Sequence, residues 1–304
     1  MHLLTLRDLD AQALLDLLEL AKRVKESPGP WSSALSGKSL ALLFEKTSTR
    51  TRASFEVAVA QLGGHSTYLD VRSTNLGVGA LEDEVKCLAR YYNAIAARVH
   101  RHGVLERMAA AAGEVPVINA LSDEAHPCQL LGDLLTFSEK VANWRGAKYA
   151  WVGDGNNVAA SFVALAARLG LKLVVATPPR YQLPPGVVSW AESVPGSRVS
   201  FTRDPRDAVD DADVVYTDTW VSLGQEAEEA ERVEAFAGYQ VNAGLVSRAK
   251  ADHVFMHCLP AHRGREVTDD VLDSPNSVVF DQAENRLHAQ KALLLWLLGE
   301  TRER

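Results

Sequence analysis

The sequence predicts an α/β protein with two domains, each a mostly parallel sheet flanked by helices. Its 304 residues exceed one typical small domain and fit two of about 150. Hydrophobic residues make up 47% of the chain, which is enough for two cores. Short apolar runs alternate with amphipathic segments in both halves, and this alternation is typical of strands joined by crossover helices.

The first half opens with an amphipathic helix, because apolar residues recur at helical spacing from Leu14 to Ala21. Gly29-Pro30 ends that region. The pattern then predicts strands at 39–44, 66–69, 94–99 and 115–119, and helices at about 51–62, 81–92 and 103–112. A long helix is expected to begin around Pro127, since proline is tolerated in a first turn, and to run to about Lys140.

The second half repeats the rhythm. It predicts strands at 149–153, 171–176, 213–218 and 253–258, and helices at 157–169 and about 284–299. We expect one domain at 1–143, a second at 144–285, and a C-terminal helix, 286–304, that returns to pack on the first domain.

Charge and cysteine usage exclude several classes of protein. A net charge of −7 without a Lys/Arg-rich run argues against nucleic-acid binding. Cys87, Cys128 and Cys258 lie far apart, which suggests neither a disulfide scaffold nor a zinc finger and fits a reducing cytoplasm. The early charged residues rule out a signal peptide, and the apolar stretch Ala292–Leu298 is too short to span a membrane.

A run of hydroxyl and guanidinium groups, Ser48–Arg52, lies where the strand 39–44 would give way to a helix. The first N–H groups of a helix lack intrahelical partners and carry partial positive charge, so a bound dianion completes open hydrogen bonds. The hydroxyls add donors and Arg50 adds a bidentate one. The alternative is an N-capping residue followed by surface arginines, but five such residues in succession favour a phosphate site.

His126-Pro127-Cys128-Gln129 lies at a strand-to-helix junction. There His126 would donate to a ligand carbonyl, and Gln129, one turn on, would accept from an amide. Helix capping with a buried amide is the competing interpretation. A helix N-terminus disfavours imidazole protonation, so His126 is expected to be neutral.

His257-Cys258-Leu259-Pro260 ends another predicted strand. A buried structural cysteine is the default interpretation of Cys258, since a nucleophile would need a partner base and an oxyanion hole. Neighbours in a strand point to opposite faces, so His257 is not expected to be that base.

Two loops of the second half carry polar groups. Gly153–Asn157 only superficially resembles a dinucleotide fingerprint, because the third glycine and the later acidic residue are absent, and this disfavours an NAD-dependent oxidoreductase. Asn157, at a helix start, suits a carboxylate instead. Thr217–Gly224 holds Asp218 among hydroxyls, as an amino-acid ammonium site would need, unless it is an ordinary Asx turn. The acidic run 226–232 is interpreted as a solvated helix face.

Taken together, these blocks resemble the carbamoyltransferase family, and within it the branch that acts on ornithine. The blocks are Ser48–Arg52, Arg98, His126–Gln129, Asp218–Gly224, His257–Pro260 and Ala283–Arg286. Their order and spacing agree along nearly the whole chain, and the ordered set is far more specific than any single block.

The resemblance implies that the first domain binds carbamoyl phosphate. The implied contacts are Ser48, Thr49, Arg50, Thr51, Asn75, Arg98, His126, Gln129, Cys258, Leu259 and Arg286. The implied catalytic residues are Arg98, His126, Cys258 and Arg286. Arg98 would reach both the phosphate and the carbonyl oxygen, and His126 would polarise that oxygen. Gln129 and the backbone at Leu259 would orient the carbamoyl NH₂.

The resemblance also implies an ornithine site. Its contacts would be Asn157, Asp218, Ser222 and the backbone at Leu223. Cys258 would lie beside the attacking δ-amine and position it, without covalent catalysis. The neutral amine would attack the carbamoyl carbon directly, giving citrulline and phosphate with no metal and no cofactor. Closure of the two domains would bring the two substrates together.

Two departures from the family pattern stand out. Leu223 replaces a methionine of similar volume. The loop 73–84 lacks the family's Glu-Ser step and its Asp-Thr-Ala helix start, and it is one residue shorter. In the family this loop reaches a neighbouring subunit's site, and Asn75 occupies the position from which relatives contact carbamoyl phosphate. Because subunits of the family share their sites, the resemblance implies a homotrimer or larger homo-oligomer.

Other acceptors and another class of function remain as alternatives. Transfer to putrescine or acetylornithine stays open, whereas aspartate is disfavoured because the loop 72–84 contains no lysine. A non-catalytic binding or regulatory homologue would need a damaged site, and no matched position is damaged. The sequence does not separate a biosynthetic from a catabolic enzyme.

Overall fold

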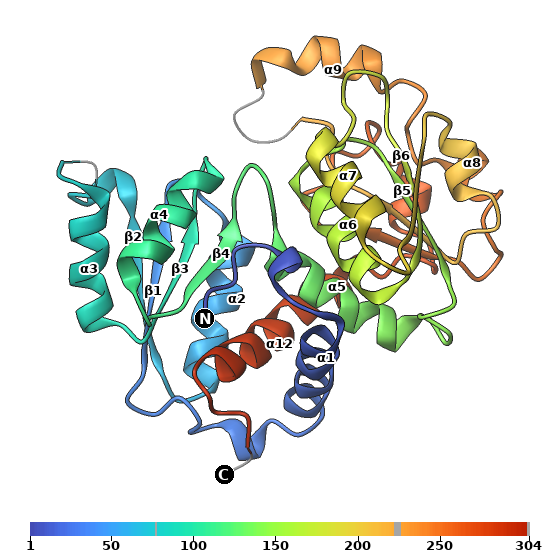
Figure 1. Ribbon diagram of the computed structural model, residues 1–304. Helices are drawn as coiled ribbons and strands as arrows, with labels where there is room; N and C mark the ends of the chain where they lie inside the picture. Colours follow the sequence, from blue (N-terminus) through green and yellow to red (C-terminus); the bar gives the residue numbers. More distant parts are fainter. Residues whose placement is uncertain (77, 222–225, 303–304) are drawn as a thin grey trace. The chain divides into compact units, whose positions relative to one another are not determined.

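The computed structural model describes residues 1–76, 78–221 and 226–302. Its contacts divide the chain into two units: unit 1 comprises Met1–Leu135 and Glu284–Arg304, and unit 2 comprises Thr136–Ala283. Each unit contains one parallel sheet flanked by helices (Figure 1). The predicted α/β class is therefore confirmed. No helix among the described residues is long and apolar enough to cross a bilayer.

The sheet of unit 1 has the strand order β2-β1-β3-β4. Its strands are β1 (Ser39–Phe44), β2 (His65–Asp70), β3 (Ala94–Arg98) and β4 (Val117–Leu121). Every residue of β3 is buried, because helices cover both faces of the sheet, and this explains its unbroken apolar run. Phe44 of β1 pairs with Arg98 of β3, so the carboxyl ends of these central strands are level.

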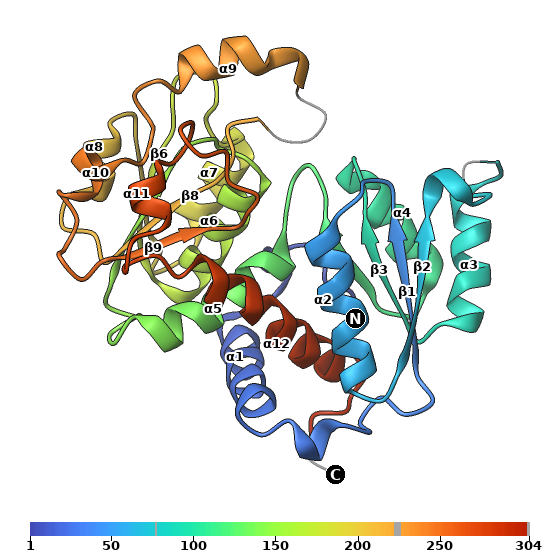
Figure 2. The same cartoon turned by 180° about the vertical axis from the view of Figure 1, so that it is seen from behind.

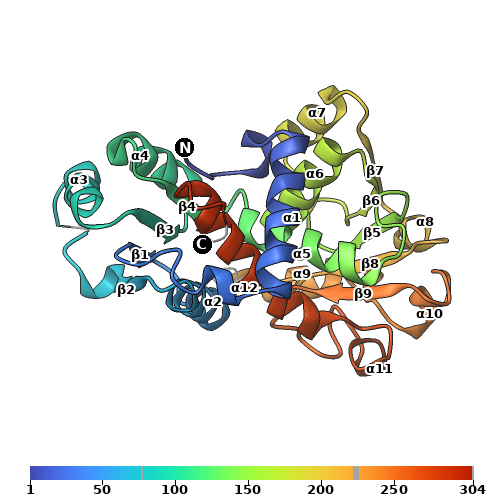
Figure 3. The same ribbon diagram turned by 90° about the horizontal axis from the view of Figure 1, so that it is seen from below.

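Helices pack on both faces of this sheet. The helices that begin in unit 1 are α1 (Ala11–Glu26), α2 (Thr49–Gln61), α3 (Leu81–Tyr91), α4 (His102–Ala112) and α5 (Pro127–Lys140). Apolar residues of α3 and α4 form a core with Ala41 and Ile95, and α2 lies on the opposite face (Figure 3). The last helix, α12 (Val279–Leu297), belongs to unit 1 from Glu284 onward, which confirms that the C-terminal helix packs on the first half.

The sheet of unit 2 has the strand order β7-β6-β5-β8-β9. Its strands are β5 (Lys148–Val152), β6 (Lys172–Ala176), β7 (Arg198–Thr202), β8 (Val214–Thr217) and β9 (Val254–His257). Its helices are α6 (Asn157–Leu169), α7 (Pro185–Ser193), α8 (Pro205–Val209), α9 (Glu229–Ala235), α10 (Ala243–Val246) and α11 (Asp269–Leu272). Phe162 of α6 packs among aromatic rings that include Tyr149 and Tyr216. Phe255 of β9 shares the other core with α10 and α11 (Figure 2).

In each sheet the strand order reverses at one place, between β1 and β3 in unit 1 and between β5 and β8 in unit 2. At such a switch point the connections leave in opposite directions and open a crevice at the carboxyl ends of the strands, where α/β proteins bind ligands. The residues that follow or end these strands are therefore candidates for ligand binding: Ser48 and Arg98 in unit 1, and Asn156 and Asp218 in unit 2.

Gln290 places a buried amide inside α12. Its side chain is 1% exposed, and neither amide atom finds a hydrogen-bond partner among the described residues. Since an unsatisfied buried polar group costs about 1–3 kcal/mol, Gln290→Leu should raise the free energy of unfolding by about 1–2 kcal/mol. Denaturant unfolding measures the change. The exposed Gln61→Leu serves as the control and should change little; a less stable Gln290→Leu protein would contradict this account.

Candidate active site

The start of α2 forms a cradle of donors at the switch point of unit 1. Ser48 is the N-cap, with extended backbone, and its Oγ accepts a hydrogen bond from the Thr51 N–H at 3.4 Å. Thr49 is exposed, Arg50 is half-buried and Thr51 is buried. Helix N–H groups and hydroxyls thus share one end of α2, which is an arrangement suited to an anion.

Three buried side chains accompany this cradle: Arg98, His126 and Arg286. Arg98 is the last residue of β3, and Arg286 Nη2 donates to Thr51 Oγ1 at 2.8 Å. Arg286 fits against α5 because Gly132 leaves room: a Cβ there would lie 3.1 Å from the Arg286 backbone nitrogen.

The electrostatics of His126 follow from these neighbours. Burial lowers its pKa well below the ordinary value, and the charges of Arg286 and Arg98 lower it further. The predicted neutral imidazole is supported, with burial as the largest cause. Thr51, Arg98, His126 and Arg286 therefore form one cluster within unit 1.

Gln129 presents a fixed acceptor in the first turn of α5. Its Nε2 donates to Asp133 Oδ1 at 2.9 Å, which sets the orientation of the amide. Its buried Oε1 has no partner among the described residues. The nearby Cys128 thiol contacts the Asn119 carbonyl oxygen at 3.4 Å, and burial raises its pKa to about 12, so it is not a nucleophile.

Asn75 has no hydrogen bond to this cluster among the described residues. It is exposed in the loop before α3, where the Val78 N–H donates to its backbone oxygen at 2.9 Å.

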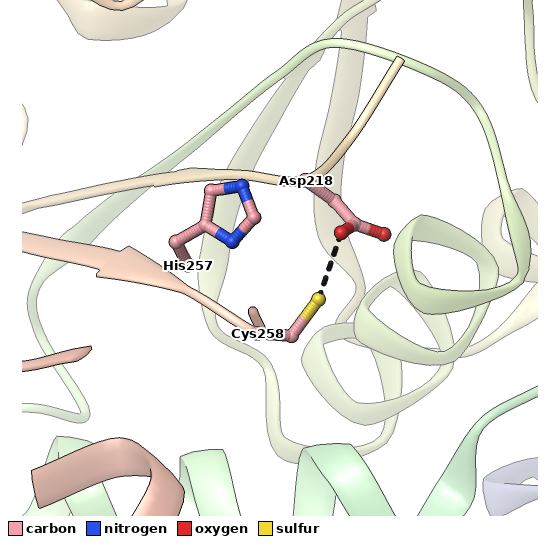
Figure 4. A group of neighbouring side chains, drawn as sticks. All are labelled: Asp218, His257 and Cys258. Atoms are coloured by element: carbon pink, nitrogen blue, oxygen red, sulfur yellow. Dashed lines mark hydrogen bonds between the residues drawn. The ribbon is translucent and has the colours of Figure 1, made fainter. Parts of the chain in front are cut away.

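The carboxylate of Asp218 is the centre of the polar groups in unit 2. It follows β8 and is 6% exposed. Cys258 Sγ donates to its Oδ1 at 2.9 Å (Figure 4). Asn156 Nδ2 donates to its Oδ2 at 2.7 Å. Asn156 is the N-cap of α6, and the predicted Asn157 is the half-buried first residue of that helix. Sequence reasoning missed Asn156, although an asparagine before a helix is a capping signal.

Asp218, His257 and Cys258 each offer one atom that could ligate a metal ion, and these three atoms lie within 4.8 Å of one another (Figure 4). The prediction that His257 and Cys258 point to opposite faces is therefore wrong, because β9 ends at His257 and the alternation stops there. His257 Nδ1 accepts from the Leu259 N–H at 2.9 Å, and its Nε2 lies 3.2 Å from Oε1 of the buried Glu266. Since the side chains of all three residues already make hydrogen bonds, the cluster is better suited to fixing the orientation of these side chains than to binding a metal ion.

Ser222 and Leu223 lie outside the described residues, but Arg232 holds the residues on either side of them. Arg232 Nη1 donates to Trp220 O at 3.0 Å and to Asp154 Oδ2 at 2.9 Å, and its Nε donates to Glu228 Oε2 at 3.0 Å. Arg232 is 6% exposed, so the interpretation of 226–232 as a solvated face is wrong for this residue. The Glu228 to Arg232 spacing indicates a helix, whereas the burial depends on Asp154, far away in the sequence.

Models of known protein families match the two halves of the chain separately. Residues 1–139 match the family model "Aspartate/ornithine carbamoyltransferase, carbamoyl-P binding domain", and residues 145–297 match its "Asp/Orn binding domain". An ornithine carbamoyltransferase of Archaeoglobus fulgidus is 49% identical over 99% of both chains. An anabolic one of Pyrococcus furiosus is 52% identical over 98% of this chain and 96% of its own.

Solved structures of ornithine carbamoyltransferases are also similar to this chain. The ornithine carbamoyltransferase of Pyrococcus furiosus superposes with a TM-score of 0.94 at 51% identity, covering 98% of this chain and 97% of that one. The enzyme of Thermus thermophilus gives 0.88 at 44% identity, covering 98% of each chain.

Proposed function

The chain belongs to the aspartate/ornithine carbamoyltransferase family, and from that premise we infer that it transfers the carbamoyl group of carbamoyl phosphate to ornithine. The relatives that carry this activity in their names match almost the whole chain at about half identity. We propose 1–143 as the carbamoyl phosphate domain, 144–285 as the ornithine domain and 286–304 as the returning helix. The observation that carries the proposal is the buried cluster of Thr51, Arg98, His126 and Arg286 beside the start of α2.

We propose that carbamoyl phosphate binds through this cluster. The start of α2, with Ser48 to Thr51, would hold the phosphate dianion. Arg98 would bridge the phosphate and the carbonyl oxygen, and His126 and Arg286 would donate to that oxygen as negative charge develops on it. The fixed Oε1 of Gln129 would accept from the carbamoyl NH₂. Asn75 would act at a neighbouring subunit's site.

Ornithine would bind through unit 2. The Asp218 carboxylate would pair with the α-ammonium group, and Asn157 would donate to the α-carboxylate, together with Ser222 and the backbone at Leu223. Cys258, whose thiol donates to Asp218, would line the path of the δ-amine. The backbone at Leu259 would orient the carbamoyl NH₂. The Leu259 N–H itself donates to His257 Nδ1.

The step itself is a direct displacement at carbon. The neutral δ-nitrogen forms a bond to the carbamoyl carbon, and the resulting tetrahedral oxyanion is stabilised by preorganised donors. The bond from that carbon to the bridging oxygen then breaks, and phosphate leaves. The nitrogen loses one proton, and we propose that the departing phosphate accepts it. The products are citrulline and inorganic phosphate.

We further propose a homotrimer or larger homo-oligomer that works in the cytoplasm. Val78, beside Asn75, is 83% exposed, as expected of a loop that reaches a neighbour. The three free cysteines suit a reducing compartment. Light scattering that returned the mass of a single 33.1 kDa chain would contradict the oligomer.

A comparison of acceptors tests the function. The purified protein is incubated with carbamoyl phosphate and, in parallel, with ornithine, acetylornithine, putrescine or aspartate, while phosphate release is followed. Release should be fastest with ornithine, because only it combines a free α-amino-acid group with a δ-amine. Release no faster with any amine than without one would rule out the transferase.

The Asp154–Arg232 pair predicts a pH effect on ornithine binding. Burial raises the pKa of Asp154 to about 6, and Arg232 opposes that rise. The carboxylate is therefore ionised above about pH 6 and loses its partnership with Arg232 as the pH falls through that value. Asp154→Asn should raise the ornithine KM about tenfold at pH 8, given the worth of a charged hydrogen bond.

The ratio of variant to wild-type KM is the quantity to follow, because titration of ornithine itself cancels in it. The ratio should shrink towards one as the pH falls from 8 to 5.5. Glu231→Gln, which alters the exposed ion pair with Arg180, provides the control and should behave as wild type. A ratio near one at every pH would show that the pair does not support ornithine binding.

A further inference from the structure

One buried hydroxyl holds the turn between β4 and α5 (Figure 1). Ser122 Oγ receives hydrogen bonds from the Ala125 N–H at 3.3 Å and from Asn119 Nδ2 at 3.2 Å. It also lies 2.8 Å from His102 Nδ1 and 3.4 Å from the Ala125 carbonyl oxygen. His102 is the first residue of α4 and is 6% exposed, and Ser122 is fully buried.

Several groups surround the Ser122 hydroxyl, which has one proton and two lone pairs. The Ala125 N–H points at Oγ, and the two protons of Asn119 Nδ2 are shared among Leu4 O, Ser122 Oγ and the Ala125 carbonyl oxygen. The shortest of the Oγ contacts is the 2.8 Å bond to His102 Nδ1, and the tautomer of His102 decides which of these two atoms donates.

This bond fixes the peptide that precedes His126. Both polar groups of Ala125 are held, since its carbonyl oxygen also accepts from the Ser122 N–H at 3.0 Å and from Asn119 Nδ2 at 3.2 Å. The His102 backbone adds a second tie, because its N–H donates to Asp123 Oδ1 at 2.7 Å. His102 thus anchors the turn to α4 by its imidazole and by its backbone.

We propose that His102 is a positioning residue for the transfer reaction. Acting through Ser122, it holds the turn 122–125 so that the His126 imidazole meets the carbonyl oxygen of carbamoyl phosphate. The proposal rests on the proposed function. His102 itself does not touch the substrate; a small displacement of His126 is enough to slow the reaction, because rates depend steeply on the placement of a donor.

Two substitutions at the same site separate positioning from bulk. His102→Leu keeps much of the volume but removes the nitrogen that bonds Ser122 Oγ. His102→Asn places an amide close to the position of Nδ1, and an amide can accept from Ser122 Oγ or donate to it. We expect His102→Leu to lower kcat about tenfold with both KM values within twofold of wild type, and His102→Asn to recover most of that loss.

Ser122→Ala completes a double-mutant cycle. It should lose at least as much activity as His102→Leu, because it also removes the acceptor of the Ala125 N–H. The double variant should lose no more than Ser122→Ala alone, because the His102 bond is already broken in Ser122→Ala. Equal kcat values for His102→Leu and wild type, equal impairment of His102→Leu and His102→Asn, or additive losses would each overturn the proposal.

The same assays distinguish the inference from the function on which it rests. Wild-type protein that forms no citrulline overturns both. Active wild-type protein with an unaffected His102→Leu variant overturns the inference alone. If His102→Leu fails to fold, Ser122→Ala and His102→Asn still decide the matter, with thermal unfolding recorded for each.

Discussion

Arg98→Met is expected to lower kcat/KM for carbamoyl phosphate about 1000-fold, since removing one preorganised donor at a developing oxyanion typically costs 10²–10³ in rate. Arg98 ends β3 at the switch point of unit 1 and is 9% exposed, so its charge acts where water screens it little. Methionine keeps an unbranched side chain out to the ε position while removing every N–H. Steady-state kinetics at saturating ornithine measure the loss.

Arg101→Met is the matched control for Arg98→Met. Arg101 lies three residues later and is exposed at the N-cap of α4, so its removal should leave kcat/KM within about twofold of wild type, as for most surface changes. Thermal unfolding checks that both variants are folded. A folded Arg98→Met protein with a rate within threefold of wild type would remove Arg98 from the mechanism.

Asp218→Asn is expected to raise the ornithine KM about 100-fold while the KM for carbamoyl phosphate changes little. A hydrogen bond to a charged group is worth about 1.5–3 kcal/mol, and the substitution removes the only charge proposed to face the α-ammonium group. It also places an NH₂ group against Asn156 Nδ2 or Cys258 Sγ, both of which donate to Asp218. The split between the two KM values separates this effect from general destabilisation.

Asp252→Asn, in the same unit, is the control for Asp218→Asn. Asp252 is exposed before β9, and both KM values should stay near wild type. If Asp218→Asn raises both KM values equally, Asp218 supports the fold of unit 2 without contacting ornithine.

The fold followed from the sequence wherever an element carried its own pattern. The buried strands β1, β3, β8 and β9 read as apolar runs because helices cover both faces of each sheet. Strand β7 had no such pattern and was not predicted, because Arg198–Thr202 is a largely exposed edge strand with alternating polar residues. The start of α12 was placed five residues late, because Val279 to Ala283 extend a helix whose strong pattern begins only afterwards.

The site residues also differ in whether a local sequence pattern marks them. Ser48 and His126 carry local signals, since each lies at a helix start that the sequence marks. His102 and Arg232 do not: His102 acts on Ser122, twenty residues away, and Arg232 on Asp154, seventy-eight residues away. Such contacts depend on which strands are neighbours in the sheet. A single sequence shows the residues but not the order of the strands in the sheet.

Following the carbon atom of carbamoyl phosphate tests the central claim most directly. Carbamoyl phosphate labelled with ¹³C is mixed with ornithine and the protein, and the product is identified by NMR and mass spectrometry. We expect the label in a ureido carbon bonded to the δ-nitrogen of ornithine, with one phosphate released per labelled product. Label found only in hydrolysis products, or on the α-nitrogen, would contradict it.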